Sequence, residues 1–364
     1  MGSPQANNPG QYYTPGTYPG ANFFPYNVTP GHINEWQLSV EHEFARSYMA
    51  SIAYVGSQAS NLQYPTDLNQ VTNPASLALI AAGGITQAQI QSLRPFPDWG
   101  NITGNNYNAK THYNALQFSI NKHYSSGLLF SFNYAWSHFL DDQDSSGWGS
   151  RAGTQVWQIG NNPSANYGNS NFDIPQAFKG YASYELPFGK GKSLLNSNAL
   201  ENEVAGGWRI TGTVIAQSGV PFTITTSGAN NSFSQCSGCS WYPNVVSNPK
   251  TGVPAAPSSD GPGAISFFNP AAYVAAASGT FGDEGRNSIR GPRLTVVNLG
   301  IAKTFTLTER VHLELRSDWV NTLNHPSFNP PGNSLGGSNF GVIDNATGVS
   351  VAPRSGQLSA HVTF

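Results

Sequence analysis

Hydrophobic and polar residues alternate along nine segments of this chain. In the segment NEWQLSVEHEF, Trp36, Leu38 and Val40 fall on one side, and polar residues occupy the positions between them. Because the side chains of a β-strand point alternately to its two faces, this period of two predicts strands with one apolar and one polar face. The expected strands cover residues 34–44, 48–56, 113–124, 128–139, 176–188, 207–219, 294–305, 310–321 and 358–364.

The connections between these strands alternate between short and long ones. The long ones are rich in Asn, Gly, Ser and Pro, and one of them contains PASLALIAAGGITQAQIQSL, a run that favours a short helix. Such long loops are uncommon in compact soluble domains, whereas transmembrane β-barrels have short turns at the periplasmic rim and long loops outside the cell. The short links are residues 45–47, 123–127, 188–205 and 306–309, and the long ones are residues 57–112, 140–175, 219–293 and 323–354.

This pattern predicts an all-β fold, namely a transmembrane antiparallel β-barrel with long extracellular loops. Only 10% of the residues are charged, against roughly 25% in ordinary soluble proteins, and 12% are aromatic. No apolar run reaches the roughly 18 residues of a transmembrane helix, and a mean hydropathy of −0.32 suits strands in which alternate residues face lipid. A soluble antiparallel protein is the alternative. The net charge of −2 gives no basic surface, so nucleic acid is not an expected partner.

Aromatic residues on the apolar faces gather near strand ends, as in the girdles that barrels carry at both membrane interfaces. Lys303 also falls on an apolar face, close to a short turn, where its aliphatic stem can reach the interface. The girdle residues are Trp36, Phe44, Tyr134, Trp136, Trp208, Trp319 and Phe364.

A row of charged residues lies on the polar face of one expected strand. Glu314, Arg316 and Asp318 alternate with apolar residues, so we predict that they face the lumen of the barrel. Two roles stay open for them: they line a substrate path, or they pair across strands and stiffen the wall.

The number and direction of the expected strands indicate whether they can form a complete barrel. Nine strands of alternating direction begin outside the cell and end in the periplasm, whereas a bacterial single-chain barrel has an even number of strands and leaves no edge unpaired in lipid. We therefore expect the C-terminal part of a larger barrel, with residues 1–32 as an extracellular loop remnant and residues 33–364 as the barrel portion. The N-terminus lacks the basic and apolar regions of a signal peptide, which agrees with a fragment.

Several motifs carry a resemblance to a known family. The runs VEHEFARSYMASIAYVGSQASNL, YELPFGKGKSL, GGWRITGTVIAQSGVPFTI and WVNTLNHPSFNPP resemble the TonB-dependent outer-membrane receptors of the Oar-like, carboxypeptidase-regulatory-domain type, over essentially residues 30–364. The resemblance implies a location in the bacterial outer membrane and uptake of a bulky solute such as an oligosaccharide or a peptide. It also implies a regulatory β-sandwich, a plug and a barrel of about 22 strands, of which about nine are expected here.

The resemblance gives a meaning to the end of the chain. An aromatic residue that closes an alternating last strand resembles the signal read by the barrel-assembly machinery, with Leu358, Ala360, Val362 and Phe364 as its outward positions. The implied partners are outer-membrane lipid, this machinery, an extracellular solute, and the TonB system through the plug. The plug and TonB box are missing from this sequence, so we do not expect it to transport on its own. A passive porin-like or structural barrel and a secreted glycan-binding β-domain are the alternatives.

Two cysteines stand close together in a polar loop, in the run SQCSGCSWYPN. For Cys236 and Cys239 we favour a local disulfide of an exported protein. A zinc site needs about four ligands, and neither a second CxxC nor a pair of histidines lies nearby. A thioredoxin-like site needs a βαβ unit, which the surroundings do not indicate.

Other chemical motifs are incomplete. GKGKS at 189–193 has Leu186 where a phosphate-binding loop needs glycine. DDQDSSG begins like a calcium loop but reaches Gly153 at its twelfth position, so a calcium site from Asp141, Asp142 or Asp144 is an alternative to a plain loop. No catalytic constellation is complete, so neither an enzyme nor a cofactor is predicted. The loop aromatics Trp148, Trp157, Trp241 and Tyr242 are candidates for stacking on sugars or for loop packing.

Overall fold

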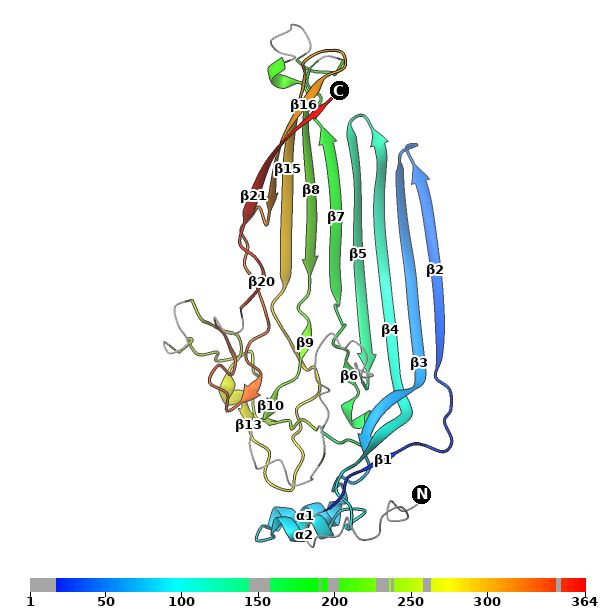
Figure 1. The fold of residues 1–364 in the computed structure, drawn as a ribbon, viewed down its shortest axis with the longest axis vertical. Coiled ribbons are helices and arrows are strands. Elements are labelled where there is room, and N and C mark those ends of the chain that lie inside the picture. The colour runs from blue at the N-terminus through cyan, green and yellow to red at the C-terminus, as the bar shows by residue number, and fades with distance from the viewer. Residues whose placement is uncertain are drawn as a thin grey trace.

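The chain folds around one tall, curved sheet. The computed structural model describes residues 18–143, 158–189, 191–195, 203–226, 236, 239–257, 263–344 and 348–364. Figure 1 shows short turns at one end of the sheet and the long loops at the other. Nine strands pair antiparallel in chain order: β2 (His32–Phe44), β3 (Tyr48–Asp67), β4 (Ile102–Ser125), β5 (Leu128–Asp141), β7 (Gln176–Glu185), β8 (Trp208–Gln217), β15 (Leu294–Thr306), β16 (His312–Val320) and β21 (Ser355–Thr363).

The sheet differs from the expected one in three ways. It has eleven strands, because β1 (Ala21–Phe23) pairs parallel with β4 and β6 (Gly168–Asn169) pairs with β5. The residues before β2 are therefore not loop throughout. β3 and β4 also pair far beyond the expected strands, up to Asp67 opposite Thr103, so the expected loop 57–112 shrinks to residues 68–101. The outer halves of these strands hold only scattered apolar residues, such as Leu62, Tyr64 and Ala109, so no sustained alternation reveals them.

The register joins the apolar residues of neighbouring strands into one continuous face. Ile52 of β3 lies opposite Phe118 of β4, which lies opposite Tyr134 of β5, and Tyr134 lies opposite Phe178 of β7. Residues directly opposite each other in a ladder share a face, and the Phe118 and Tyr134 ring centroids are 6.2 Å apart. We call this the apolar face. The intervening residues, such as Ser119, form the polar face.

Glycines on the apolar face make room for aromatic rings of the next strand. Gly56 of β3 lies opposite Trp36 of β2, and a Cβ atom at Gly56 would overlap the Trp36 indole. Gly356 of β21 is covered by Trp319 of β16 in the same way. An aromatic ring over a strand glycine restores the packing that the glycine lacks.

Replacing Gly56 by alanine is therefore expected to displace the Trp36 indole and to destabilise the sheet by about 1–3 kcal/mol, the usual cost of overpacking. The measurement is a denaturant titration followed by tryptophan emission. Gly285→Ala is the matched control, because the nearest heavy atom to a Cβ at Gly285 is 3.9 Å away. Equal stability of the two variants would contradict the expectation.

The first long loop contains the expected helix as two short ones. α1 (Pro74–Ala82) begins at Asn73, whose side chain accepts a hydrogen bond from the Ala75 amide, and α2 (Gln87–Ser92) begins at Thr86 in a capping box with Gln89. Gly83, with φ at 77°, ends α1. Neither of these helices, nor any other helical segment in the part of the chain described, combines the length and apolar character needed to cross a membrane.

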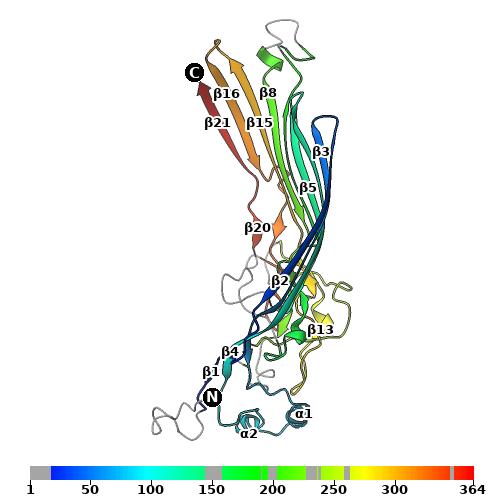
Figure 2. The ribbon, with the colours of Figure 1, turned by 90° about the vertical axis from the view of Figure 1, so that its right-hand side faces the viewer.

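The other long loops pack into short paired segments. Their apolar cluster contains Phe222, Ile224, Phe268, Tyr273 and Phe340. Figure 2 shows them gathered at the end of the sheet away from the short turns. The segments are η2 (Pro163–Asn166), β9 (Pro221–Phe222), β10 (Thr225–Thr226), β11 (Asn244–Val245), β12 (Ile265–Ser266), η5 (Pro270–Ala272), β13 (Tyr273–Val274), β14 (Ile289–Arg290), β17 (Ser327–Phe328), β18 (Ser334–Leu335), β19 (Val342–Ile343) and β20 (Val349–Val351).

Candidate functional site

Two parts of the molecule combine polar groups with a defined shape. One is the polar face of the sheet. The other is the loop layer, by which we mean residues 68–101, 158–175, 218–226, 239–257, 263–293 and 321–344 at the end opposite the short turns.

The charged side chains of the polar face form ion pairs. Arg209 of β8 donates through Nη2 to Oε2 of Glu314 of β16 at 2.6 Å, across Ala302 and Thr304 of the intervening strand β15. Arg316 donates through Nε to Oδ2 of Asp318 at 2.7 Å. The row that the sequence singles out therefore lies on the face opposite the apolar one, and Arg209 of β8 balances its charge.

A groove of about 540 Å³ lies beside these pairs, over β7, β8, β15 and β16. Its lining combines polar residues, among them Thr211, Arg316 and Asp318, with apolar ones, among them Leu299 and Trp319. Gly300 lies opposite Thr211 on one side and Asp318 on the other. Because a Cβ at Gly300 would lie 2.6 Å from Oγ1 of Thr211, the missing side chain makes room for the Thr211 and Asp318 side chains of the neighbouring strands.

The loop layer is held to the sheet by a buried ion pair. Arg286 donates through Nη2 to the carboxylate and the backbone carbonyl of Asp141, the last residue of β5, and the two side chains are 4% and 2% exposed. The Nε of Arg286 donates to the carbonyl of Asn166 in η2 at 2.7 Å. One guanidinium group thus joins three segments that are far apart in the sequence.

A second buried carboxylate, that of Asp173, also joins the loop layer to the sheet. Asp173 is fully buried and accepts hydrogen bonds from Arg290 of β14 and from the Phe139 amide, the latter at 2.8 Å. The Nδ1 of His138 lies 3.4 Å from the same carboxylate. Buried carboxylates are tolerated when they are paired and hydrogen-bonded in this way.

Gln158 joins three loops through its side-chain amide and its backbone carbonyl. Its Oε1 accepts from the amides of Tyr242 at 3.1 Å and Gly282 at 2.9 Å, and its backbone carbonyl accepts from Gln70 at 2.9 Å. Asn166 donates to the Tyr64 hydroxyl at 2.8 Å in the same region. These side-chain bonds replace the backbone ladders that the irregular loops lack.

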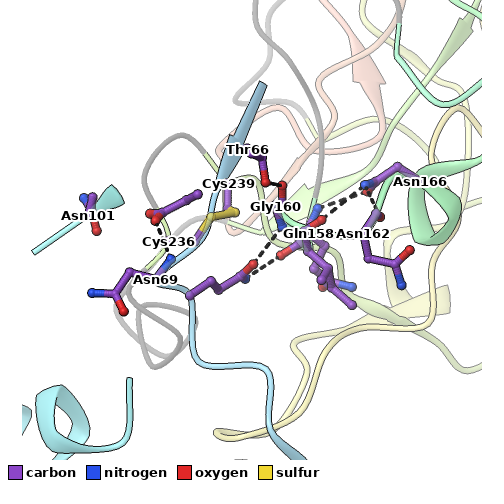
Figure 3. The surroundings of a disulfide bond; sticks show 12 residues. Thr66, Asn69, Asn101, Gln158, Gly160, Asn162, Asn166, Cys236 and Cys239 are labelled. Atoms are coloured by element: carbon purple, nitrogen blue, oxygen red, sulfur yellow. Dashed lines mark hydrogen bonds between the residues drawn. A yellow bond between two sulfur atoms is a disulfide. The ribbon is translucent and has the colours of Figure 1, made fainter. Parts of the chain in front are cut away.

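Cys236 and Cys239 form a disulfide in this network. Figure 3 shows it beside Gly160, and a Cβ at Gly160 would lie 3.2 Å from Sγ of Cys236. Gly160 in turn accepts a hydrogen bond from Thr66 of β3 and donates one to Gln70 at 2.7 Å. The disulfide therefore lies against the junction of two loops with β3.

The loop aromatics lie in different surroundings. Tyr242 is only 3% exposed, so it packs inside the loop layer and is not available to a sugar. Trp241 stacks on Phe281 with 6.5 Å between the ring centroids. Trp148 and Trp157 lie outside the described residues.

Of the acidic run at the end of β5, the structure describes Asp141 and Asp142. Asp141 is engaged by Arg286, and Asp144 lies outside the described residues. Within the described ranges, no three His, Cys, Asp or Glu residues are placed to hold a metal ion. Asp142 is buried, with Oδ2 accepting from the Lys110 amide at 3.1 Å and Oδ1 without a hydrogen-bond partner among the described residues. Burial raises the pKa of this carboxyl group above its ordinary value.

Replacing Asp142 by asparagine is expected to stabilise the loop layer at neutral pH. Because the folded pKa is raised, the contribution of Asp142 to stability is fully present below the unfolded pKa of about 3.9 and is lost as the pH rises through the folded pKa. The difference in Tm between Asp142→Asn and the parent chain should therefore grow with pH. Asp98→Asn, at an exposed position, is the control. A pH-independent difference would contradict the expectation.

The short-turn end carries lysines that satisfy turn carbonyls. Lys303 lies on the apolar face near a turn, as expected, with Nζ donating to the Glu203 carbonyl at 2.7 Å and lying 5.5 Å from the Trp208 ring centroid. Lys122 donates to the Ser125 carbonyl at 3.0 Å and lies 5.0 Å from the Tyr48 ring centroid. In GKGKS, Lys192 pairs with Glu185 at 3.0 Å in a turn that follows a strand.

The last strand, β21, pairs only with β16 among the described strands, so its other edge is unpaired there. Ala360 and Val362 lie opposite Leu315 and Leu313, on the apolar face. Leu358 and Phe364 are 80% and 95% exposed. The role of these residues in barrel assembly stays a prediction.

Sequence reasoning missed the residues that organise the loop layer. No catalytic or metal-binding spacing marks them, and Arg286 meets a partner 145 positions away in the sequence. The residues are Gln158, Asn166, Asp173, Arg286 and Arg290. Asn and Gln in loops are too common to single out. Only their burial in the folded chain distinguishes them.

The chain is similar to outer-membrane proteins. The family model for the outer membrane beta-barrel domain matches residues 2–357. The outer membrane transporter YddB from Escherichia coli is similar at a TM-score of 0.46 and 8% identity, over 95% of this chain and 34% of that one. The ferripyoverdine receptor of Pseudomonas aeruginosa is similar at a TM-score of 0.39 and 11% identity, over 92% and 27%. The chain thus spans about a third or less of these transporters. No curated protein matches it.

Proposed function

This chain belongs to the outer membrane beta-barrel domain family, and on that premise we propose that it forms part of the wall of a TonB-dependent, Oar-like transporter for a bulky solute. It resides in the bacterial outer membrane. The observation that carries the proposal is the two-faced sheet: its apolar face suits lipid, and its polar face carries charge-balanced pairs and a groove. A wall of this kind lets a solute pass without burying an unpaired charge.

The loop layer supports an uptake role. A passive pore needs only an open mouth, whereas here buried ion pairs fold the long loops into a packed structure at one end of the sheet. Coupling to the TonB system is expected to act through the plug that the resemblance implies. The charged residues of the polar face form ion pairs with one another and so stabilise the sheet. This favours a transporter wall over an enzyme.

The test is deletion of the coding sequence in the source bacterium, followed by uptake of fluorescent oligosaccharides and peptides with and without an uncoupler of the proton-motive force. Loss of uptake of either solute class, on deletion and in uncoupled parent cells, supports the proposal. Uptake that is lost on deletion but persists with the uncoupler points to a passive pore. A chain found in the aqueous fraction, with unchanged uptake, overturns the proposal.

A further inference from the structure

We infer that an outward-facing cluster at the loop end of β4 and β5 binds the phosphate group of an outer-leaflet lipid. The cluster consists of Lys110 and His112 of β4, His138 of β5, and Tyr167, which directly precedes β6. We call it the outer cluster. A lipid site of this kind needs the outer-membrane location of the chain, but it does not need the proposed uptake of a solute.

The outer cluster lies on the apolar side of the sheet, which is the side that suits lipid. β4 pairs with β5 without a register shift between His112 and Phe118, so these two side chains share a face. On β5, His138 follows Trp136 on that same face, and Trp136 is 60% exposed, as suits an aromatic girdle. The long loops of such barrels lie outside the cell. The outer cluster is therefore placed where the apolar face ends, at the height of the outer headgroups.

Lys110 has an ammonium group that is available to a ligand. Its Nζ lies 5.0 Å from the centroid of the Tyr167 ring and has no hydrogen-bond acceptor among the described residues. The Nζ atoms of Lys122 and Lys303, by contrast, donate to turn carbonyls. The ring holds the ammonium group by a cation–π interaction, which leaves its N–H groups for an anionic acceptor. Hydrogen bonds between an ammonium group and a phosphate are among the strong ones.

His112 offers a second donor beside this ammonium group. The Tyr167 hydroxyl and Nδ1 of His112 are 2.9 Å apart. The hydroxyl has no other acceptor in the described part of the chain, so we assign it as the donor. Nε2 of the imidazole then carries the ring proton and can donate to a ligand. Tyr167 is thus a positioning residue, because it orients the His112 ring and holds the Lys110 ammonium group.

The charges around the outer cluster favour an anion. Three carboxylates lie nearby, but each is at most 2% exposed: Asp141, Asp142 and Asp173. Arg286 pairs with the first and Arg290 with the third. Burial raises the pKa of the remaining carboxyl group and so reduces its negative charge. The surface presents the ammonium group and the imidazoles instead, and the His138 side chain is 54% exposed.

A lipid phosphate fits these donors because the membrane holds it at the right height. The outer leaflet of a bacterial outer membrane exposes phosphorylated glycolipid headgroups, whose acyl chains would lie along the apolar face below Trp136. Clusters of cationic side chains at a membrane surface are a known way to recognise anionic headgroups. Attraction between such charges is also stronger near the low-dielectric bilayer than in bulk water.

The test uses the full chain refolded in detergent and titrated with diphosphoryl lipid A, phosphatidylcholine or inorganic phosphate, with bound molecules counted by native mass spectrometry. The parent chain should bind lipid A more tightly than phosphatidylcholine. Lys110→Gln should weaken lipid A binding about fivefold, or about 1 kcal/mol, and His112→Gln should weaken it too. Lys179→Gln, at an exposed lysine of the polar face, is the matched control and should bind like the parent chain. Heat-modifiable migration in gels checks folding of each variant.

Three results would overturn the inference. They are no lipid A binding by the folded parent chain, equal binding by Lys110→Gln and Lys179→Gln, or inorganic phosphate bound as tightly as lipid A, which would indicate a site for free anions. Each of these leaves the transporter proposal standing if uptake still depends on this gene and on the proton-motive force. Loss of gene-dependent uptake, with lipid A binding intact, overturns the transporter proposal alone.

Discussion

Arg286→Ala is expected to unfold the loop layer while leaving the sheet in place. The substitution leaves the Asp141 carboxylate buried without its cation, and breaking a buried ion pair from one side costs about 3–5 kcal/mol. It also removes the hydrogen bond from Nε to the Asn166 carbonyl. Hydrogen exchange should therefore accelerate over residues 158–173 and 283–290, and remain slow in β3, β4 and β5.

Two companion variants make this result specific. Arg293→Ala removes a guanidinium from an exposed position in the same region and should change exchange little. Arg286→Lys keeps the charge but loses the second arm that reaches Asn166, so it should fall between the parent chain and the alanine variant. If Arg286→Ala and Arg293→Ala behave alike, the buried pair does not anchor the loops.

Phe118→Arg is expected to destabilise the folded chain in lipid by about 2–4 kcal/mol, the cost of an arginine near the bilayer midplane on the lipid face of a barrel. Phe118 lies midway along the apolar face of β4, between Leu116 and Ile120. The measurement is the denaturant midpoint in phosphatidylcholine vesicles. Gln117→Arg places the same charge on the polar face of the same strand and should cost much less. Equal costs would mean that the apolar face does not contact lipid.

The two ends of the molecule satisfy their polar groups in different ways. At the short turns, lysines satisfy turn carbonyls and lie over aromatic rings, as with Lys122 over Tyr48 and Lys303 over Trp208. At the long loops, buried carboxylates and amides join segments that have no regular ladder. This difference follows from length, because a turn of a few residues is satisfied locally and a loop of dozens needs partners from elsewhere.

The apolar and polar alternation alone determined the fold class, and each of the nine segments it indicated forms a strand of the sheet. A period of two is a local property, so neighbours in the sequence suffice to show it. The same alternation placed Glu314, Arg316 and Asp318 on one face. It failed over the outer halves of β3 and β4, because their few apolar residues are too scattered to show a period of two.

Only the tertiary structure decided how the loops are held and where the groove lies. Asp141 and Arg286 meet across 145 positions, and Gly300 makes room for the side chains of Thr211 and Asp318 from two other strands. Burial and cross-strand register create these sites, and both depend on which distant segments come together. A local sequence pattern does not show which distant segments meet. The sequence by itself therefore determined the two-faced sheet and its turns, and only the tertiary structure determined the buried and cross-strand sites.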